Sequence, residues 1–329
     1  MDRNPRTGGV RSTPMVPPRA PVMTVTLNPA IDLHLDVAGN THAEVLRTRS
    51  HRRVAGGKGV NVSGMLAALG VDSVAACLLG GPDADVFLSL LESSPFPVVP
   101  VRVQGETRTN VTIRFDGQDS RIKVNQPGPT VRGQAWRAAK IILNELMAHR
   151  RWVVLAGSLP SGTRAGAYAE LCRAAHRNGA RVAVDCERTP LLRAAPAAPD
   201  LIHLNRAELA ATTGLSCRSR RATLHAATTL LKHRPTTLLI SDGGGEALAI
   251  RNHQVWVGRP PRVPVKGPMG AGDAMLAGYI AARLEQQDPP RALARALACG
   301  AACAALPETR LPHRRDVVRW LSQVSVDRL

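Results

Sequence analysis

Aromatic residues are scarce in this chain. Phenylalanine, tyrosine and tryptophan together make up 3% of its 329 residues, so few rings are present on which nucleic-acid bases could stack. This weakens a nucleic-acid interpretation of the formal net charge of +18. Lysine is scarce too, and the arginines that supply most of the charge are spread along the chain. We interpret the charge as a solvated basic surface, which also attracts phosphorylated substrates.

Long apolar runs are also absent. No stretch of about 18 uncharged apolar residues occurs, so no membrane span is expected. Hydrophobic residues nevertheless make up 44% of the chain, which excludes a globally disordered protein. The length suits one large domain, or one with a small appendage.

Cysteine is too sparse for a secreted disulfide framework. The six cysteines form no CxxC pair and most stand among small apolar residues, which favours buried, reduced thiols and a cytoplasmic protein. Residues 1–22 are rich in proline and arginine and lack the apolar segment of a secretory signal. We expect them to form a disordered tail before a single domain over residues 23–329.

Short apolar strands alternate with helical patterns from residue 134 onward, and an earlier strand is expected at Val22–Leu27. This order predicts an α/β fold with a doubly wound, mainly parallel sheet, whose ligands lie beyond the carboxyl ends of the strands. Ile31–Val37, Asn110–Phe115 and Arg121–Asn125 instead alternate between apolar and polar residues. Such alternation indicates a sheet with one wet face, which we place in a small β appendage.

The segment Gly267–Met275 is the most informative. Gly270 and Gly272 allow a tight turn and close approach of a ligand, and a helix follows. The first amides of a helix have no intrahelical partners and lie at the positive end of its dipole, so they suit a phosphoryl group. Asp273 can take a proton from an attacking hydroxyl there; the alternative is that it only stabilises the helix N-terminus.

A second glycine-rich turn, Gly56–Asn61, also opens a helix. Gly57 permits close approach, Lys58 can pair with a phosphate, and Asn61 can hydrogen-bond a sugar hydroxyl. The segment lacks the GxxxxGK[ST] spacing of the P-loop. Its alternative interpretation is a tight strand-to-helix turn.

Polar residues also stand beside the alternating strands. Asp32 can accept hydrogen bonds from sugar hydroxyls, or it can cap the backbone. Arg108 and Asn110 begin an alternating strand, and arginine can hold a phosphate through two parallel hydrogen bonds. In a chain this rich in arginine, one such residue is also ordinary surface.

Three polar segments follow predicted strands, where a doubly wound sheet binds ligands. Two are small-residue loops, one with Ser158 and one with Ser241 and Gly243. In the third, Asn205 and Glu208 share one face of a helix start and can order Mg²⁺, directly or through its waters. The alternative is a capping box, with asparagine as the cap and glutamate at the third position.

Taken together, these segments resemble the PfkB, or ribokinase-like, family of carbohydrate kinases. The early motifs are most similar to the branch that holds 1-phosphofructokinases and tagatose-6-phosphate kinases. The resemblance runs from about residue 23 to 320 and rests on seven motifs in order: Thr26–Asp32, Gly56–Val62, Thr107–Asn110, Asn125–Pro129, Gly157–Pro160, Asn205 with Glu208, and Gly270–Asp273.

This resemblance implies a ribokinase-like core with helices on both faces of the sheet and a β-sheet lid, with strands drawn from about residues 31–54 and 100–126. It also implies a homodimer formed through the lids. The implied activity is Mg²⁺- and ATP-dependent phosphorylation of a sugar phosphate. Fructose 1-phosphate is the first expectation, and tagatose 6-phosphate and fructose 6-phosphate are the alternatives.

The resemblance further implies roles for individual residues. Asp273 would be the general base, and the amides of Gly270, Ala271 and Gly272 would stabilise the transferring phosphoryl group. Glu208 would arrange Mg²⁺. The sugar phosphate would be surrounded by Asp32, Gly57, Lys58, Asn61, Arg108, Asn110 and Ser158, and the nucleotide by Asn205, Ser241 and Gly243.

Three departures from this branch lie on the nucleotide side. His203-Leu204 replaces the usual Lys-Pro, Asp242 and Glu246 add two carboxylates near the triphosphate, and Glu308 replaces a glycine. These changes are expected to weaken ATP affinity. They motivate a second hypothesis, a non-catalytic protein that senses a sugar phosphate, whereas a nucleic-acid or membrane partner is not expected.

Overall fold

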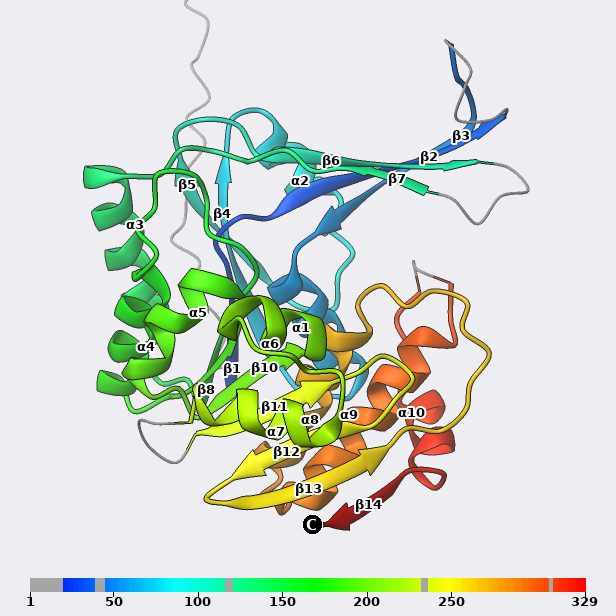
Figure 1. The fold of residues 1–329 in the computed structure, drawn as a ribbon. Helices are drawn as coiled ribbons and strands as arrows, with labels where there is room; N and C mark the ends of the chain where they lie inside the picture. Colours follow the sequence, from blue (N-terminus) through cyan, green and yellow to red (C-terminus); the bar gives the residue numbers. More distant parts are fainter. Residues whose placement is uncertain (1–19, 39–44, 116–120, 232–235, 308–309) are drawn as a thin grey trace, which may run out of the picture.

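The computed structural model describes residues 20–38, 45–115, 121–231, 236–307 and 310–329, and two sheets organise them (Figure 1). The large sheet has ten strands in the order β14-β13-β12-β11-β10-β9-β8-β1-β4-β5. Their bounds are β1 Val22–Thr26, β4 Ser73–Gly80, β5 Val98–Val103, β8 Trp152–Ala156, β9 Arg181–Asp185, β10 Leu201–Asn205, β11 Thr237–Ser241, β12 Ala247–Arg251, β13 Gln254–Arg259 and β14 Ser325–Arg328.

The large sheet is mainly parallel, as predicted. Strands β5 to β11 run parallel along its length, and β12, β13 and β14 add an antiparallel edge. Every residue of β1, β4, β8 and β11 is buried. Such continuously buried, mostly apolar strands form where helices cover both faces of a parallel sheet.

Alternate side chains of the strands enter two separate cores. In β8, Val153 and Leu155 pack on one face, whereas Trp152 and Val154 pack on the other. The helices divide accordingly, and Figure 1 shows them on opposite sides of the sheet. The first core is covered by α3 Gly133–Leu146, α4 Ala167–Arg177, α5 Arg188–Ala194, α6 Arg206–Thr213 and α7 Arg220–Thr228, and the second by α1 Lys58–Ala68, α8 Ala271–Leu284, α9 Pro289–Ala304 and α10 Arg314–Leu321.

The small sheet is the expected lid, and it projects from one end of the body (Figure 1). Its order is β3-β2-β6-β7, and α2 Asp83–Ser89 lies near its base. The strands are β2 Ala30–Ala38, β3 Arg47–Gly56, β6 Arg108–Phe115 and β7 Arg121–Val124. Apolar alternation does not mark strand β3, whose sequence is RTRSHRRVAG, but most of it falls within the lid segment of about residues 31–54 that the family resemblance implies. It is an edge strand, and charged side chains are usual on exposed edges.

Two expected boundaries differ in the structure. The second lid segment begins at Arg108 rather than near residue 100, because β5 pairs with β4 at the edge of the large sheet. The strand expected from Val22 does begin there, but Ala20 is already buried, so the tail expected at residues 1–22 overlaps the start of the described domain; residues 1–19 lie outside the described residues. The six cysteines are free and buried, as expected.

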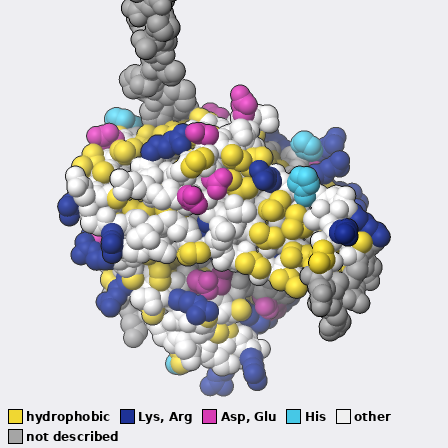
Figure 2. Space-filling view, turned by 90° about the horizontal axis from the view of Figure 1, so that it is seen from above, with side chains coloured by type: hydrophobic (Ala, Val, Ile, Leu, Met, Phe, Trp, Pro, Cys, Tyr) yellow, Lys and Arg dark blue, Asp and Glu magenta, His cyan; other side chains and the backbone are white. Residues whose placement is uncertain are grey.

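The surface and the helices bear on two other expectations, that of a solvated basic surface and that of no membrane span. Lysine and arginine side chains are scattered among apolar and acidic ones over the face shown in Figure 2. Among the described residues, no helix has the length and apolarity that a membrane crossing requires.

Arg150 anchors the start of β1, and its loss should destabilise the protein. Its side chain is 6% exposed and donates to the carbonyls of Ala20, at 2.8 Å, and Leu146, at 3.0 Å. Arg150→Ala should lower the free energy of unfolding by about 2–3 kcal/mol, because buried carbonyls lose charged donors. Urea unfolding measures the change. Arg151→Ala is the matched control: its exposed bond to Leu284 should be worth under about 0.5 kcal/mol, and an equal loss would contradict the argument.

Candidate active site

A cavity of about 1070 Å³ opens at the carboxyl ends of the parallel strands. The last residues of β1, β9, β10 and β11 line it: Thr26, Asp185, Asn205 and Ser241. This is the position that a doubly wound sheet offers to ligands. Of the site residues expected from the sequence, all except Asp32 and Asn110 line this cavity.

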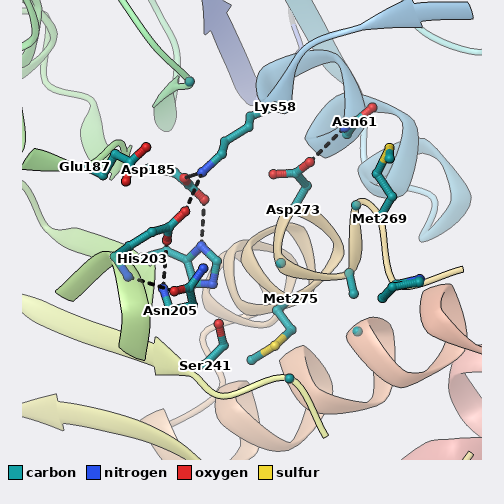
Figure 3. Close-up of a pocket in the computed structure, with 18 of the residues that line it drawn as sticks. Lys58, Asn61, Asp185, Glu187, His203, Asn205, Ser241, Met269, Asp273 and Met275 are labelled. Carbon is teal, nitrogen blue, oxygen red and sulfur yellow. Dashed lines mark hydrogen bonds and ion pairs between the residues drawn. The ribbon is translucent and has the colours of Figure 1, made fainter. Parts of the chain in front are cut away.

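Asp273 lies buried in the first turn of α8 and faces the cavity (Figure 3). Asn61 donates from Nδ2 to its Oδ2 at 2.8 Å, so the two glycine-rich segments meet here. Burial, together with the nearby charge of Asp185, raises the pKa of Asp273 to about 7. A carboxylate with such a pKa can accept a proton near neutral pH.

The mouth of α8, by which we mean its N-terminal end at the cavity, begins with Gly270, whose φ of +80° suits glycine. The amide of Ala271 donates to Pro268 O at 3.2 Å. Within the described part of the chain, no such backbone partner is seen for the amides of Gly272 and Asp273. These two amides, at the positive end of the helix dipole, are therefore available to an anion beside the Asp273 carboxylate.

A glycine is also required where α1 begins. Gly57 caps this helix with a φ of +147°, and a Cβ atom there would lie 2.8 Å from the Thr26 side chain. The close approach of α1 to β1 brings Lys58 and Asn61 over the end of the strand.

Lys58 belongs to a polar network on the cavity wall (Figure 3). Its Nζ donates to Asp185 Oδ1 at 2.6 Å and lies 3.4 Å from Glu208 Oε1. Asp185 uses its second oxygen to bind His203 Nδ1 at 2.6 Å. Asp185 therefore joins one residue from α1 to another from β10.

The network keeps Asp185 ionised. Burial opposes its charge, but Lys58 and His203 outweigh burial and lower the pKa of Asp185 to about 2. Burial also opposes the charge of Lys58, yet Asp185 and Glu208 raise the pKa of its amine above the usual value. Because ionised Asp185 can only accept, His203 must donate from Nδ1.

Asn205 and Glu208 form the capping box that was the structural alternative. Asn205 Oδ1 accepts from the Glu208 amide, and Glu208 Oε2 accepts from the Asn205 amide, both at 2.8 Å. The second oxygen, Glu208 Oε1, remains on the cavity side near Lys58. Among the described residues, no group of three or more histidine, cysteine or acidic side chains could hold a metal ion.

Asp32 and Asn110 lie outside the cavity wall. They face each other across β2 and β6, and Asn110 Nδ2 donates to Asp32 Oδ1 at 2.8 Å. Burial raises the pKa of Asp32, although Asn110 and nearby cations oppose the rise. The pair therefore stands on the lid, beside the cavity.

Arg108 and Ser158 tie the lid to the body. Arg108 donates to the carbonyls of Gln126, at 3.2 Å, and Asn28, at 2.9 Å, so its guanidinium is already engaged. Asn28 Nδ2 in turn donates to Ser158 Oγ at 3.2 Å. Arg108 therefore links backbone segments while it lines the cavity, and the phosphate contact that the sequence suggested for it stays a prediction.

The acidic residues of the nucleotide-side loop do not line the cavity, contrary to the expected repulsion of a triphosphate. Arg206 pairs with Asp242 at 2.9 Å, and Arg220 pairs with Glu246 at 2.5 Å. Each added carboxylate is thus neutralised by an arginine. The departure at Glu308 lies outside the described residues.

Asp185 and Arg188 are among the wall residues that the sequence motifs did not mark as site residues. Asp185 ends a buried strand, and the strand-end rule alone could have marked it. Arg188 follows it and also lines the cavity. Its only local signal is its position three residues after that strand end.

The site combines a buried carboxylate with the N-terminal amides of a helix that begins at a glycine. Both lie at the end of a parallel sheet, near a lid. This arrangement can hold a phosphoryl group beside a base. Residues 25–314 match the pfkB family carbohydrate kinases, and the chain belongs to this family. It is therefore a sugar kinase, which transfers a phosphoryl group to an alcohol.

Individual relatives agree with this assignment. The chain is 38% identical over 260 residues to 1-phosphofructokinase of Rhodobacter capsulatus, covering 79% of this chain and 82% of the relative. It is 27% identical over 282 residues to tagatose-6-phosphate kinase of Staphylococcus epidermidis, covering 85% and 90%. The crystal structure of a possible 1-phosphofructokinase from Thermotoga maritima superposes with a TM-score of 0.84 at 25% identity, covering 94% of this chain and 99% of that one.

Proposed function

We propose that this chain is a 1-phosphofructokinase, which transfers the γ-phosphoryl group of ATP to fructose 1-phosphate and forms fructose 1,6-bisphosphate. The observation that carries the proposal is the buried Asp273 carboxylate at the mouth of α8, held by Asn61 in a cavity large enough for two substrates. The 38% identity to a 1-phosphofructokinase supports the choice of sugar.

In the proposed reaction, Asp273 takes the proton of the sugar hydroxyl. The hydroxyl oxygen then bonds to the γ-phosphorus, and the bond from that phosphorus to the bridging oxygen breaks as ADP leaves with the electron pair. The amides of Gly272 and Asp273, together with Lys58, neutralise charge on the transferring group. Phosphoryl transfer depends mainly on this positioning and neutralisation.

The nucleotide would lie along Asn205, Ser241 and Gly243, with its base against the apolar part of the wall at Leu297 and Ala301. Bound Mg²⁺ would supply positive charge that neutralises the phosphates. Because Mg²⁺ keeps several waters and needs few carboxylates, Glu208 Oε1, which lies 3.4 Å from Lys58 Nζ on the cavity side, fits this role. The ATP requirement and the six free, buried thiols are consistent with a cytoplasmic enzyme.

The identity of the substrate is tested by measuring ADP release with Mg-ATP and each of three sugar phosphates: fructose 1-phosphate, tagatose 6-phosphate and fructose 6-phosphate. The proposal expects the highest kcat/KM with fructose 1-phosphate. A preference for tagatose 6-phosphate would support the second candidate, which the similarity to a tagatose-6-phosphate kinase motivates. Turnover of unphosphorylated sugars alone would contradict both, and an inactive protein that still binds a sugar phosphate would favour the sensor hypothesis.

We also propose a homodimer formed through the lid. One face of this sheet carries Leu33 and Leu35 of β2 with Val111 of β6, and Ile122 and Val124 of β7 are 43% and 53% exposed. Burial of this apolar face against a second lid would stabilise a dimer. Light scattering after size exclusion should give the mass of two chains, and Ile122→Asp should reduce it to one. A monomeric wild type at micromolar concentration would contradict the proposal.

A further inference from the structure

The backbone at Arg188 is strained. Its φ of +57° lies in the left-handed region, which a branched or long side chain adopts at a cost and which glycine adopts freely. The Arg188 amide donates to Thr212 Oγ1 at 2.8 Å, and this bond from α6 holds the strained conformation in place. Strained residues that the surroundings hold in place cluster at ligand sites, so the position calls for a functional explanation.

The side chain of Arg188 stands at the edge of the candidate active site. Arg188 lines the cavity together with Asp185 and Glu187, between the loop that holds Ser158 and the one that holds Asn205. Its side chain is 70% exposed, and its Nε lies 3.7 Å from Glu187 Oε2, beyond hydrogen-bond distance. An exposed pair at this distance constrains the guanidinium little.

The charges along the cavity wall show why this cation matters. Among the described residues that line the cavity, the lysine and arginine side chains are Lys58, Arg108 and Arg188. Lys58 is paired with two carboxylates, and Arg108 donates to two backbone carbonyls. Arg188 therefore has the wall's most available cationic group. Carboxylates outnumber these cations on the wall, since Asp185, Glu187, Glu208 and Asp273 all line it.

We propose that Arg188 is a substrate-binding residue, whose guanidinium binds a phosphate group of a substrate in the cavity. This contact explains why an arginine is retained at a position where its backbone is strained. The inference rests on the proposed function, because it requires phosphorylated ligands. A guanidinium matches phosphate oxygens with two parallel hydrogen bonds. The phosphate belongs either to the sugar phosphate or to the nucleotide, and the two sources are separated by experiment.

Arg188→Gly is the informative variant, because it removes the side chain and also relieves the strain. Its thermal stability should equal or exceed that of the wild type, so lost binding would not reflect unfolding. Arg188→Lys keeps the charge but loses the two-pronged geometry. Arg193→Ala is the matched control, since Arg193 is an exposed arginine of the same helix that does not line the cavity.

The assay measures kcat and KM for each substrate in turn at saturating concentration of the other. Arg188→Gly should raise one KM roughly tenfold at low ionic strength, with kcat changed less than about threefold, as expected for the loss of a charged hydrogen bond. Arg188→Lys should recover part of the loss, Arg193→Ala should match the wild type, and added salt should shrink the effect. The substrate whose KM rises identifies the source of the phosphate.

Two results would overturn the inference. One is a variant in which both KM values stay within about twofold of wild type, and the other is a loss confined to kcat. If the wild type turns over no sugar phosphate, the proposed function fails instead. Thermal stabilisation of wild type and Arg188→Gly by ATP or by fructose 1-phosphate then still tests Arg188: equal stabilisation would overturn its role, and weaker stabilisation of the variant would support it.

Discussion

Asparagine in place of Asp273 should reduce kcat by roughly 10²–10⁴-fold, the usual contribution of a general base. The amide has nearly the same shape as the carboxylate, and its oxygen can still accept the hydrogen bond from Asn61. It cannot take a proton from the sugar hydroxyl. The KM values for both substrates should change little, because the α8 amides and Lys58 remain. Steady-state ADP release, with each substrate varied in turn, measures the effect.

The same substitution should leave the fold intact or more stable. Burial and Asp185 raise the pKa of Asp273 to about 7, so the ionised carboxylate is disfavoured in the folded protein. Stability associated with this group is present at low pH and is lost as the pH rises through about 7, and Asp273→Asn removes that loss. Asp72→Asn, at an exposed aspartate, is the matched control. A variant at 273 that is both folded and fully active would contradict the assignment of the base.

Methionine in place of Lys58 should lower kcat/KM by roughly 10²–10³-fold, comparable to the loss of one donor that stabilises transition-state charge. The Nζ lies between Asp185 and Glu208 on the same wall as Asp273, so no other described amine can replace it there. The protein should also lose stability, because buried Asp185 keeps only His203 as a partner for its charge. Kinetics and thermal unfolding together measure both losses.

Lys140→Met provides the control for Lys58→Met. Lys140 pairs with Glu170 at 2.5 Å between α3 and α4, and neither residue lines the cavity. This substitution removes an equally close ion pair of a lysine without touching the site, so kcat/KM should stay within about twofold of wild type. If both variants lost activity equally, the effect at Lys58 would reflect general destabilisation and not phosphoryl transfer.

The parts of the fold that could be predicted are those with a local pattern. The buried strands β1, β8 and β11 are short apolar runs, and α8 begins where Gly270 and Asp273 mark a helix N-terminus. Strand β3 has no such local pattern. It forms because its backbone pairs with that of β2, and its cationic side chains are exposed at the edge of the sheet. Its register with β2 is set by this tertiary pairing.

The candidate site likewise divides into residues that local motifs reveal and contacts that only the folded chain creates. The motifs led to Lys58, Asn61 and Asp273, since glycine-bounded helix starts are visible in the sequence. The link from Asp185 to Lys58 and His203 joins residues more than a hundred positions apart in one case, so no local spacing reveals it. The positive φ of Arg188 is likewise a property of the folded backbone, because nothing in the sequence marks an arginine that adopts a glycine-like conformation.

The central claim is that Asp273 takes the proton of the sugar hydroxyl while the amides at the mouth of α8 hold the transferring group. Rapid-quench measurement of a single turnover, with enzyme in excess over labelled ATP and with saturating fructose 1-phosphate, tests it most directly. The wild type should convert the bound label to fructose 1,6-bisphosphate within one turnover time, whereas Asp273→Asn should bind both substrates and form the product at least about a hundredfold more slowly. Formation of bisphosphate at the wild-type rate by Asp273→Asn would contradict the claim.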